Sequence, residues 1–228
     1  PVSAATPVST ADGFIFAAVG DQAGQTPDTT HNSISYGTVA NGTATSIAVG
    51  QGNTITSANG SSSAYGNQNS INGNQANAFG DGNTVTGAYA QAFGDANIAK
   101  GTNAIAYGYN NTVDGTTKNY RDRTFDNESD AATLQTGSWN SNSVAIGSKN
   151  TALGSSALAV GNEAKAQMSE SIAIGHEAQA DKTWGIAIGT RATASDVRSL
   201  ALGHQAKSAG YKANAIGADA VSYTHLTL

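Results

Sequence analysis

The sequence repeats itself with a period of fourteen residues, and this repeat limits the possible folds more than any other feature. In each copy a glycine directly follows a large apolar residue, and these glycines lie fourteen residues apart from Gly66 to Gly108 and from Gly147 to Gly217. Self-similarity at a fixed period is typical of solenoids, in which each copy buries its apolar side against its neighbours. The repeat glycines are Gly50, Gly66, Gly80, Gly94, Gly108, Gly147, Gly161, Gly175, Gly189, Gly203 and Gly217.

Each copy contains two short segments with the side-chain period of a β-strand. Val144, Ala145 and Ile146 alternate large, small and large, and Gly147 then permits a tight turn. A second alternating segment follows three to five residues after the glycine, as in 83–85. One copy therefore predicts one coil of two strands and two turns, and stacked coils predict a parallel β-roll with a rise of about 4.8 Å per coil.

The composition indicates that the interior of this roll is narrow. Leu, Ile, Val and Phe number 36 (7 + 13 + 11 + 5) of 228 residues, and only 12% of residues are charged. Chains with so few large apolar residues rarely fill a thick core. We expect the alanines of the first strand to line the interior: Ala145, Ala159, Ala173, Ala187, Ala201 and Ala215.

The large residues that flank these alanines would then form an apolar stripe on the outside of the roll. A soluble monomer rarely exposes such a stripe, so it predicts self-association around a symmetry axis. The opposite assignment, with the large residues inside, stays open from the sequence. The proposed interface residues are Val144, Ile146, Leu158, Val160, Ile172, Ile174, Ile186, Ile188, Leu200 and Leu202.

A recurring asparagine follows the glycine by three residues in several copies. Stacked coils place these side chains above one another, where their amides can form a hydrogen-bonded ladder. We interpret them as structural residues. They are Asn53, Asn69, Asn83, Asn97, Asn111 and Asn150.

The motifs Asn142–Gly147, Ser171–Gly175 and Ser199–Gly203 resemble the head repeats of trimeric autotransporter adhesins, the YadA-like family. The resemblance covers residues 14–222, after a linker at 1–13 and before a tail at 223–228 that we expect to be non-native. It implies a left-handed parallel β-roll, a homotrimer, and display on the outer membrane surface of a Gram-negative bacterium. We find no stalk, neck or membrane anchor in the sequence, and therefore expect a head fragment.

An insertion at about 116–140 interrupts the repeat between Gly108 and Gly147. It is rich in charged and aromatic residues, a composition that also occurs in interfaces. A solvated loop is the simpler interpretation, and contact with a neighbouring chain or a host ligand is the alternative. The candidate contact residues are Arg121, Arg123, Phe125 and Trp139.

No arrangement of residues predicts catalysis, a metal site or a cofactor. The chain has no cysteine, and its pI of 5.2 argues against nucleic acid as a partner. His176 and His204 occupy equivalent positions two coils apart, about 10 Å, which is too far for one metal ion within a chain.

We therefore predict a non-enzymatic adhesin head. The resemblance implies a role in virulence, with extracellular-matrix proteins such as collagen, host cells or other bacteria as targets. Multivalent weak contacts, rather than a pocket, would supply the binding. The alternative is an ice-binding solenoid, for which the Thr-x-Thr pairs Thr54/Thr56 and Thr84/Thr86 are the only support.

Overall fold

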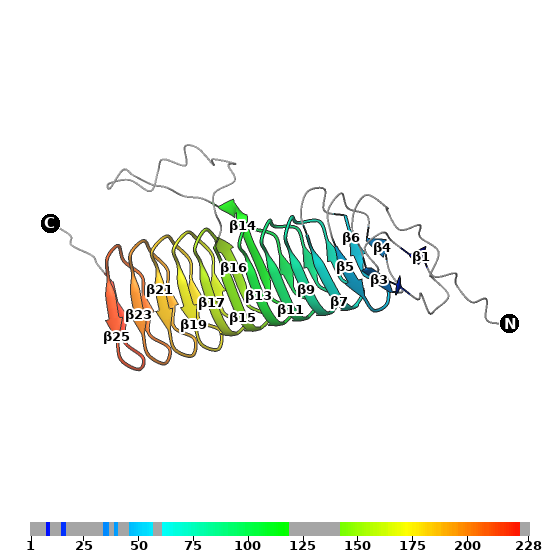
Figure 1. Ribbon diagram of the computed structural model, residues 1–228. Helices are drawn as coiled ribbons and strands as arrows, with labels where there is room; N and C mark the ends of the chain where they lie inside the picture. The colour runs from blue at the N-terminus through cyan, green and yellow to red at the C-terminus, as the bar shows by residue number, and fades with distance from the viewer. Residues whose placement is uncertain are drawn as a thin grey trace.

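The computed structural model is an elongated β-roll in which two parallel sheets face each other (Figure 1). It describes residues 46–56, 61–118 and 142–223, together with the backbone of four short strands nearer the N-terminus. No α-helix occurs in these residues. The fold class expected from the repeat, an all-β parallel solenoid, is confirmed.

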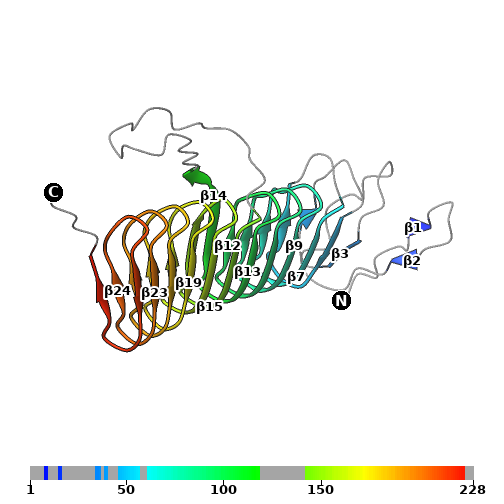
Figure 2. The ribbon, with the colours of Figure 1, turned by 90° about the vertical axis from the view of Figure 1, so that its left-hand side faces the viewer.

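Each of the two long sheets contains twelve strands, and the chain alternates between them, one strand at a time. We call them sheet I and sheet II. Figure 2 shows the turns that join the two sheets, seen from the side. Two further strands, β1 (Val8–Ser9) and β2 (Ile15–Phe16), form a separate antiparallel pair.

Sheet I consists of β3 (Ile34–Tyr36), β5 (Ile47–Val49), β7 (Ser63–Asn67), β9 (Asn77–Asp81), β11 (Gln91–Asp95), β13 (Ile105–Tyr109), β15 (Val144–Ser148), β17 (Leu158–Asn162), β19 (Ile172–Ile174), β21 (Ile186–Ile188), β23 (Leu200–Leu202) and β25 (Asn214–Ile216). Sheet II consists of β4 (Val39–Ala40), β6 (Thr54–Ile55), β8 (Ser70–Ile71), β10 (Thr84–Val85), β12 (Ile98–Ala99), β14 (Thr112–Lys118), β16 (Thr151–Gly154), β18 (Lys165–Ala166), β20 (Gln179–Ala180), β22 (Thr193–Ala194), β24 (Lys207–Ser208) and β26 (Val221–Ser222).

Neighbouring strands of a sheet place like residues beside like. Ala92 of β11 pairs with Ala78 of β9 on one side and with Ala106 of β13 on the other. The same register continues through the alanine and isoleucine residues of β19 and β21. Every outward or inward position of a strand therefore belongs to a column that runs along the roll.

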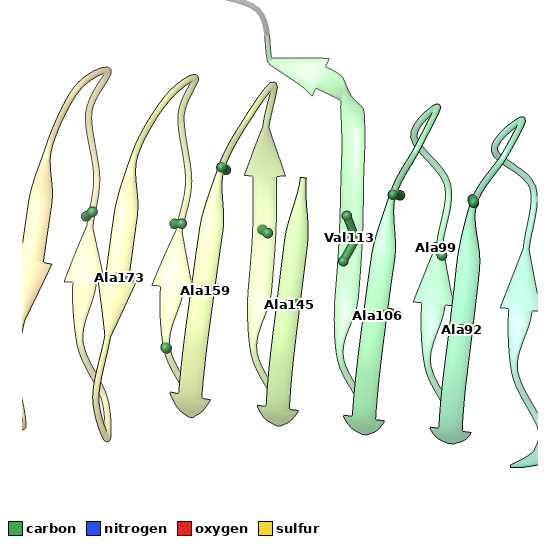
Figure 3. Packing of buried hydrophobic residues seen from close by; sticks show 14 of the residues in the cluster. Ala92, Ala99, Ala106, Val113, Ala145, Ala159 and Ala173 are labelled. Atoms are coloured by element: carbon green, nitrogen blue, oxygen red, sulfur yellow. The ribbon is translucent and has the colours of Figure 1, made fainter. Parts of the chain in front are cut away.

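The core lies between the two sheets and consists mainly of alanine methyl groups (Figure 3). Ala92, Ala106, Ala145 and Ala159 of sheet I are fully buried, as is Val113 of sheet II. Among the described residues, larger apolar side chains enter the core only from the N-terminal part of sheet II. The largest of these are Ile55, Ile71, Val85 and Val113.

The asparagine ladder expected from the sequence is confirmed. The Asn97 side chain donates to the Asn83 Oδ1 atom at 3.1 Å, and its own Oδ1 accepts from the Asn111 amide group at 2.9 Å. The Asn97 Nδ2 atom also donates to the Gly108 carbonyl at 2.8 Å. The buried Asn97 amide thereby links its own coil to both neighbouring coils, which compensates for its removal from water.

The coils stack without a gap where the insertion leaves the repeat. Ala106 of β13 pairs with Ala145 of β15, and the Asn103 Nδ2 atom donates to the Asn142 Oδ1 atom at 2.9 Å. Strand β14 continues to Lys118, beyond the start expected for the insertion at about residue 116. Residues 119–141, including the four candidate contact residues of the insertion, lie outside the described residues.

Candidate interaction surface

The outward side of sheet I carries two columns of side chains along the roll, and we call it the sheet I face. One column contains the residue three positions before each repeat glycine, and the other contains the residue directly before that glycine. In β19 these residues are Ile172 and Ile174, which flank the fully buried Ala173. Because strand side chains alternate, a buried alanine requires both neighbours to point outward.

The ten proposed interface residues all lie on this face, and none of them is buried within the single chain. Ile146 and Leu202 are 40% and 39% exposed, and the other eight are half-buried. The six alanines proposed for the interior are buried, from Ala145 at 0% to Ala215 at 2% exposure. Within one chain the large residues therefore lie outside and the small residues inside.

The repeat glycines allow the coils to approach each other closely at one corner of the roll. Gly80 has a φ of 119°, and a Cβ atom added to it would lie 2.0 Å from the carbonyl oxygen of Gly94. A side chain at this position would push neighbouring coils apart and would also strain the backbone. The glycines are therefore needed for stacking as well as for turning.

Within the described ranges the turns also contain eighteen non-glycine residues with positive φ, which were not predicted from the sequence. Glu163 and Arg191 are examples, with φ of 60° and 56°. The backbone N–H of Arg191 donates to the carbonyl of His176 at 2.8 Å, one coil earlier. Stacking thus supports a conformation that non-glycine residues otherwise rarely adopt. The fourteen-residue spacing of these positions was the available signal, but no residue type marks them.

In strands β7, β9 and β11 the sheet I face is aromatic instead of aliphatic. The rings of Tyr65 and Phe79 have centroids 5.0 Å apart with planes 8° from parallel, and Phe79 and Phe93 repeat this geometry at 5.0 Å and 3°. Because the rings stack along the roll, their faces contact each other and their edges point outward. The accompanying column is polar here, with Ser63, Asn77 and Gln91.

A second ladder of contacts follows the turns near the C-terminal end. The Trp184 Nε1 atom donates to Glu170 Oε2 at 3.0 Å, and the Arg198 guanidinium lies 4.8 Å from the centre of the Trp184 ring. Lys212 lies 4.8 Å from the ring centre of Tyr211. Glu170, Trp184, Arg198 and Lys212 are fourteen residues apart, so this ladder was detectable from spacing but was not predicted.

The charged side chains of the other turn form ion pairs between coils. Arg191 donates to Glu177 at 2.6 Å, and Lys149 lies 3.7 Å from Glu163. The hydrogen bond from Arg191 holds the pKa of Glu177 below its ordinary value of 4.5, and the same bond raises the pKa of Arg191. These pairs are exposed, so each contributes little to stability.

The two histidines considered as ligands each lie beside one carboxylate. His176 Nδ1 is 3.8 Å from Glu177, and His204 Nδ1 is 3.9 Å from Asp219. Within the described residues, no group of three or more histidine or acidic side chains could hold a metal ion. The same part of the chain contains no helix that could span a membrane.

The Thr-x-Thr pairs lie on the outward side of sheet II but do not continue from coil to coil. Thr84 pairs with Ser70 on one side and with Ile98 on the other. The hydroxyl array that an ice-binding surface would require is therefore interrupted, and nothing in the geometry favours that function.

A family model described as the YadA head domain repeat matches three segments of the chain, at residues 86–111, 140–164 and 185–206. The chain contains a YadA-like head domain. The three matched segments lie on both sides of the insertion and include strands of both sheets. No curated protein matches the chain.

YadA-like head domains belong to surface-exposed autotransporter adhesins, and the family suggests an adhesin-type function and implies extracellular display. The family also implies trimeric assembly, and heads of this kind are typically non-enzymatic. The binding target is a separate question, because the matched repeats define the scaffold and not its ligand.

Proposed function

We propose that the chain forms the head of a homotrimeric adhesin, in which three left-handed rolls of fourteen-residue coils join through their sheet I faces. The observation that carries this proposal is the half-exposed aliphatic column of that face, beside an interior of alanine. A roll with such small core residues buries little apolar surface. Because burial stabilises a fold by only about 25 cal/mol per Å² of apolar surface, one chain gains little from its own core. Association of the aliphatic columns supplies a second core that one chain lacks.

The charge distribution on the sheet I face suits a second copy of the same chain. Its two columns contain no charged residue from Ile47 to Ile216. A symmetric interface brings identical surfaces together, so charges on these columns would meet like charges or lose their water. Two columns without charged residues avoid both costs.

The dimensions of the sheet I face set the area that association can bury. Twelve strands give eleven spacings, so the face is about 53 Å long at about 4.8 Å each. The outward columns and their flanks span about 13 Å, or four residues at about 3.3 Å, which gives about 700 Å². A typical stable pairwise interface buries about 800 Å² on each partner, whereas in a trimer this face would be divided between two neighbours.

Adhesion would then use the outer surfaces that the assembly leaves free. Sheet II presents a polar outward side with residues such as Thr84, Lys165 and Gln179, and the turns present repeated charged and aromatic side chains. Three copies of each repeated contact allow weak individual bonds to add up to strong attachment. We propose extracellular-matrix proteins such as collagen, host cells or other bacteria as targets, reached from the outer membrane surface during infection.

Residues of the insertion are proposed to contribute a further contact, made by Arg121, Arg123, Phe125 and Trp139. Charged and aromatic residues next to a regular scaffold often carry recognition. Loss of ligand binding on removal of the insertion from an intact trimer would support this contact, and unchanged binding would contradict it.

The test of the trimer is a double substitution, Ile174→Asp with Ile188→Asp. Both side chains are half-exposed in the single chain, so the roll should still fold, whereas the interface would contain six unpaired carboxylates. Sedimentation should show monomers, and binding to immobilised matrix proteins should fall with the loss of multivalency.

The matched control is Gln179→Asp with Thr193→Asp, on sheet II of the same two coils. These side chains are also half-buried and point outward, but away from the proposed interface. The control should remain trimeric. If the Ile174/Ile188 variant also sediments as a trimer, the sheet I face is not the interface.

A further inference from the structure

A periodic roll has a difficulty when it associates with copies of itself. Sliding one copy along another by one coil, about 4.8 Å, again brings like columns onto like columns. Register is weakly specified wherever a surface repeats without interruption. Between β15 and β23 the sheet I face is such a surface, since each strand presents two aliphatic residues. Something on the chain must distinguish the correct register from its neighbours.

The side chains of the sheet I face change from polar and aromatic to mainly aliphatic at β13. This change interrupts the repeat and can distinguish one register from the next. In the preceding strand β11 the outward residues are Gln91, Phe93 and Asp95. In β13 the corresponding residues are Ile105, Tyr107 and Tyr109, which are 36%, 57% and 49% exposed. Strand β13 thus presents three large exposed side chains in one row, and the column beside the aromatic residues turns from polar to aliphatic there.

The ring of Tyr107 departs from the aromatic stack that precedes it. Its centroid lies 6.1 Å from that of Phe93, and the two planes differ by 39°, compared with 5.0 Å and 3° between Phe79 and Phe93. A ring outside a tight stack buries less of its surface against other residues of its own chain. More than half of Tyr107 is therefore available to a neighbour.

We propose that the β13 row, formed by Ile105, Tyr107 and Tyr109, sets the axial register between copies of this chain. This inference rests on the association of sheet I faces proposed above. In the correct register each row meets the same row of another copy, and aromatic contacts form across the interface. A slip of one coil places Gln91 of one copy against Ile105 of another, which desolvates a polar group without a partner.

The test uses two co-expressed chains, the native chain and a variant. In the variant, the boundary between the polar and the aliphatic part of the sheet I face, which we call the step, lies one coil further along the chain. The triple variant Ile105→Gln, Tyr107→Phe and Tyr109→Asp gives β13 the outward residues of β11. The step from polar to aliphatic then lies between β13 and β15. In a trimer of the variant alone, the steps of all three chains lie at the same level. In a mixed trimer, the steps lie at the same level only if the variant slips by one coil relative to the native chain.

Single cysteines report the register, because the 228-residue sequence contains none. Val160 and Ile174 are neighbours in one column of the face, one coil apart. A disulfide requires Cα atoms within about 7 Å, so it favours cysteines at the same level. Aligning the two steps brings residue 174 of the variant to the level of residue 160 of the native chain.

In mixed trimers, we expect variant Ile174→Cys to form disulfides with native Val160→Cys at several times the yield of the reverse pair, variant Val160→Cys with native Ile174→Cys. Trimers of either chain alone should cross-link only cysteines at the same level. A mixed trimer that cross-links both pairs equally, or keeps same-level links, would overturn the register proposal and leave the trimer intact. Monomeric chains without any disulfide would instead overturn the proposed association itself.

Discussion

The roll contains two segments that solve the same stacking problem with different chemistry. The asparagine segment comprises residues 46–118 and 142–150, and the alanine segment comprises residues 151–223. In the asparagine segment a buried amide bridges each pair of coils, as when Asn83 donates to Asn69 at 2.9 Å. In the alanine segment the same position holds alanine, and backbone bonds close the turn, as from the Ala192 N–H to the Gly189 carbonyl at 3.2 Å.

The repeat glycines adopt different φ angles in these two kinds of turn. Gly66 and Gly94 have φ of 113° and 110°, whereas Gly175 and Gly203 have φ of 133° and 137°. The strands of sheet I also differ in length, with five residues in β9 and three in β21. One repeat length therefore supports two turn geometries, and the choice depends on whether a side chain or the backbone supplies the bridging donor.

The difference teaches where each segment obtains its stability. The largest fully buried side chains all lie between Ser46 and Asn150. The asparagine segment thus has more material in its core and more bonds between its coils. The alanine segment has a thinner core and a more strongly aliphatic outer face, so we infer that it depends more on association with other copies.

The largest effect should come from breaking the asparagine ladder. Replacing Asn97 with alanine removes the amide that bonds to Asn83, Phe93, Gly108 and Asn111. Buried groups without partners cost about 1–3 kcal/mol each, so the free energy of unfolding should fall by about 3 kcal/mol or more. Urea denaturation measures this change. The exposed Asn67→Ala in the same segment serves as the control and should be nearly neutral.

If Asn97→Ala were as mild as its control, the asparagine segment would already use the backbone-bridged turn of the alanine segment. The two segments would then differ in sequence but not in the origin of their stability.

The next largest effect should come from filling the interior of the alanine segment. In the asparagine segment Ala99 lies between Val85 and Val113 of the neighbouring strands, so Ala99→Val continues an existing column of valines. Ala194 lies between Ala180 and Ser208, where nothing larger is accommodated. Ala194→Val should therefore cost about 1–3 kcal/mol through overpacking, and Ala99→Val should cost much less. Equal melting temperatures for the two variants would mean that the interiors are equally wide.

A smaller effect is expected from removing the insertion. Deletion of residues 117–141 leaves 14 residues (39 − 25) between Gly108 and Gly147, and the new turn Gly115–Thr116–Asn142 copies the turn Gly101–Thr102–Asn103. The coils on both sides already stack, as shown by the bond from Ile105 N–H to the Ser143 carbonyl at 2.9 Å. Shortening a loop changes stability by only about 1 kcal/mol or less. Thermal unfolding followed by circular dichroism should stay cooperative, and a loss of folding would show that the insertion supports the roll.

The smallest effect concerns the exposed ion pair of the alanine segment. Because Arg191 lowers the pKa of Glu177 below 4.5, the folded state favours the charged carboxylate. Its stabilisation is present above the unfolded pKa and is lost as the pH falls through the folded pKa. Glu177→Gln should lower the melting temperature slightly at pH 7 and by less at pH 3. A similar difference at both pH values would assign the effect to packing instead of charge.

Much of this architecture followed from the spacing of a few residue types. Repeat glycines such as Gly80 and Gly94, with an alanine two residues earlier, predicted the stacked strands, because a strand alternates its side chains and a stack repeats its contacts. The asparagine ladder followed for the same reason. The positive φ of Glu163 and Arg191 could not be predicted, because their side chains show no preference for that conformation and only a bond to the preceding coil supports it.

The sequence by itself determined the repeat, the parallel β class and the columns of like residues, since all three depend on a period that can be counted. Only the tertiary structure decided which face of sheet I is inside. The order of Val144, Ala145 and Ile146 fits either face, and the decision depends on the distance between the two sheets, which admits alanine and little else. The stacking of Tyr65, Phe79 and Phe93, and the departure of Tyr107 from it, likewise depend on side-chain packing in three dimensions. A periodic sequence specifies what repeats along the roll, whereas packing specifies which of the repeated side chains remain available to a partner.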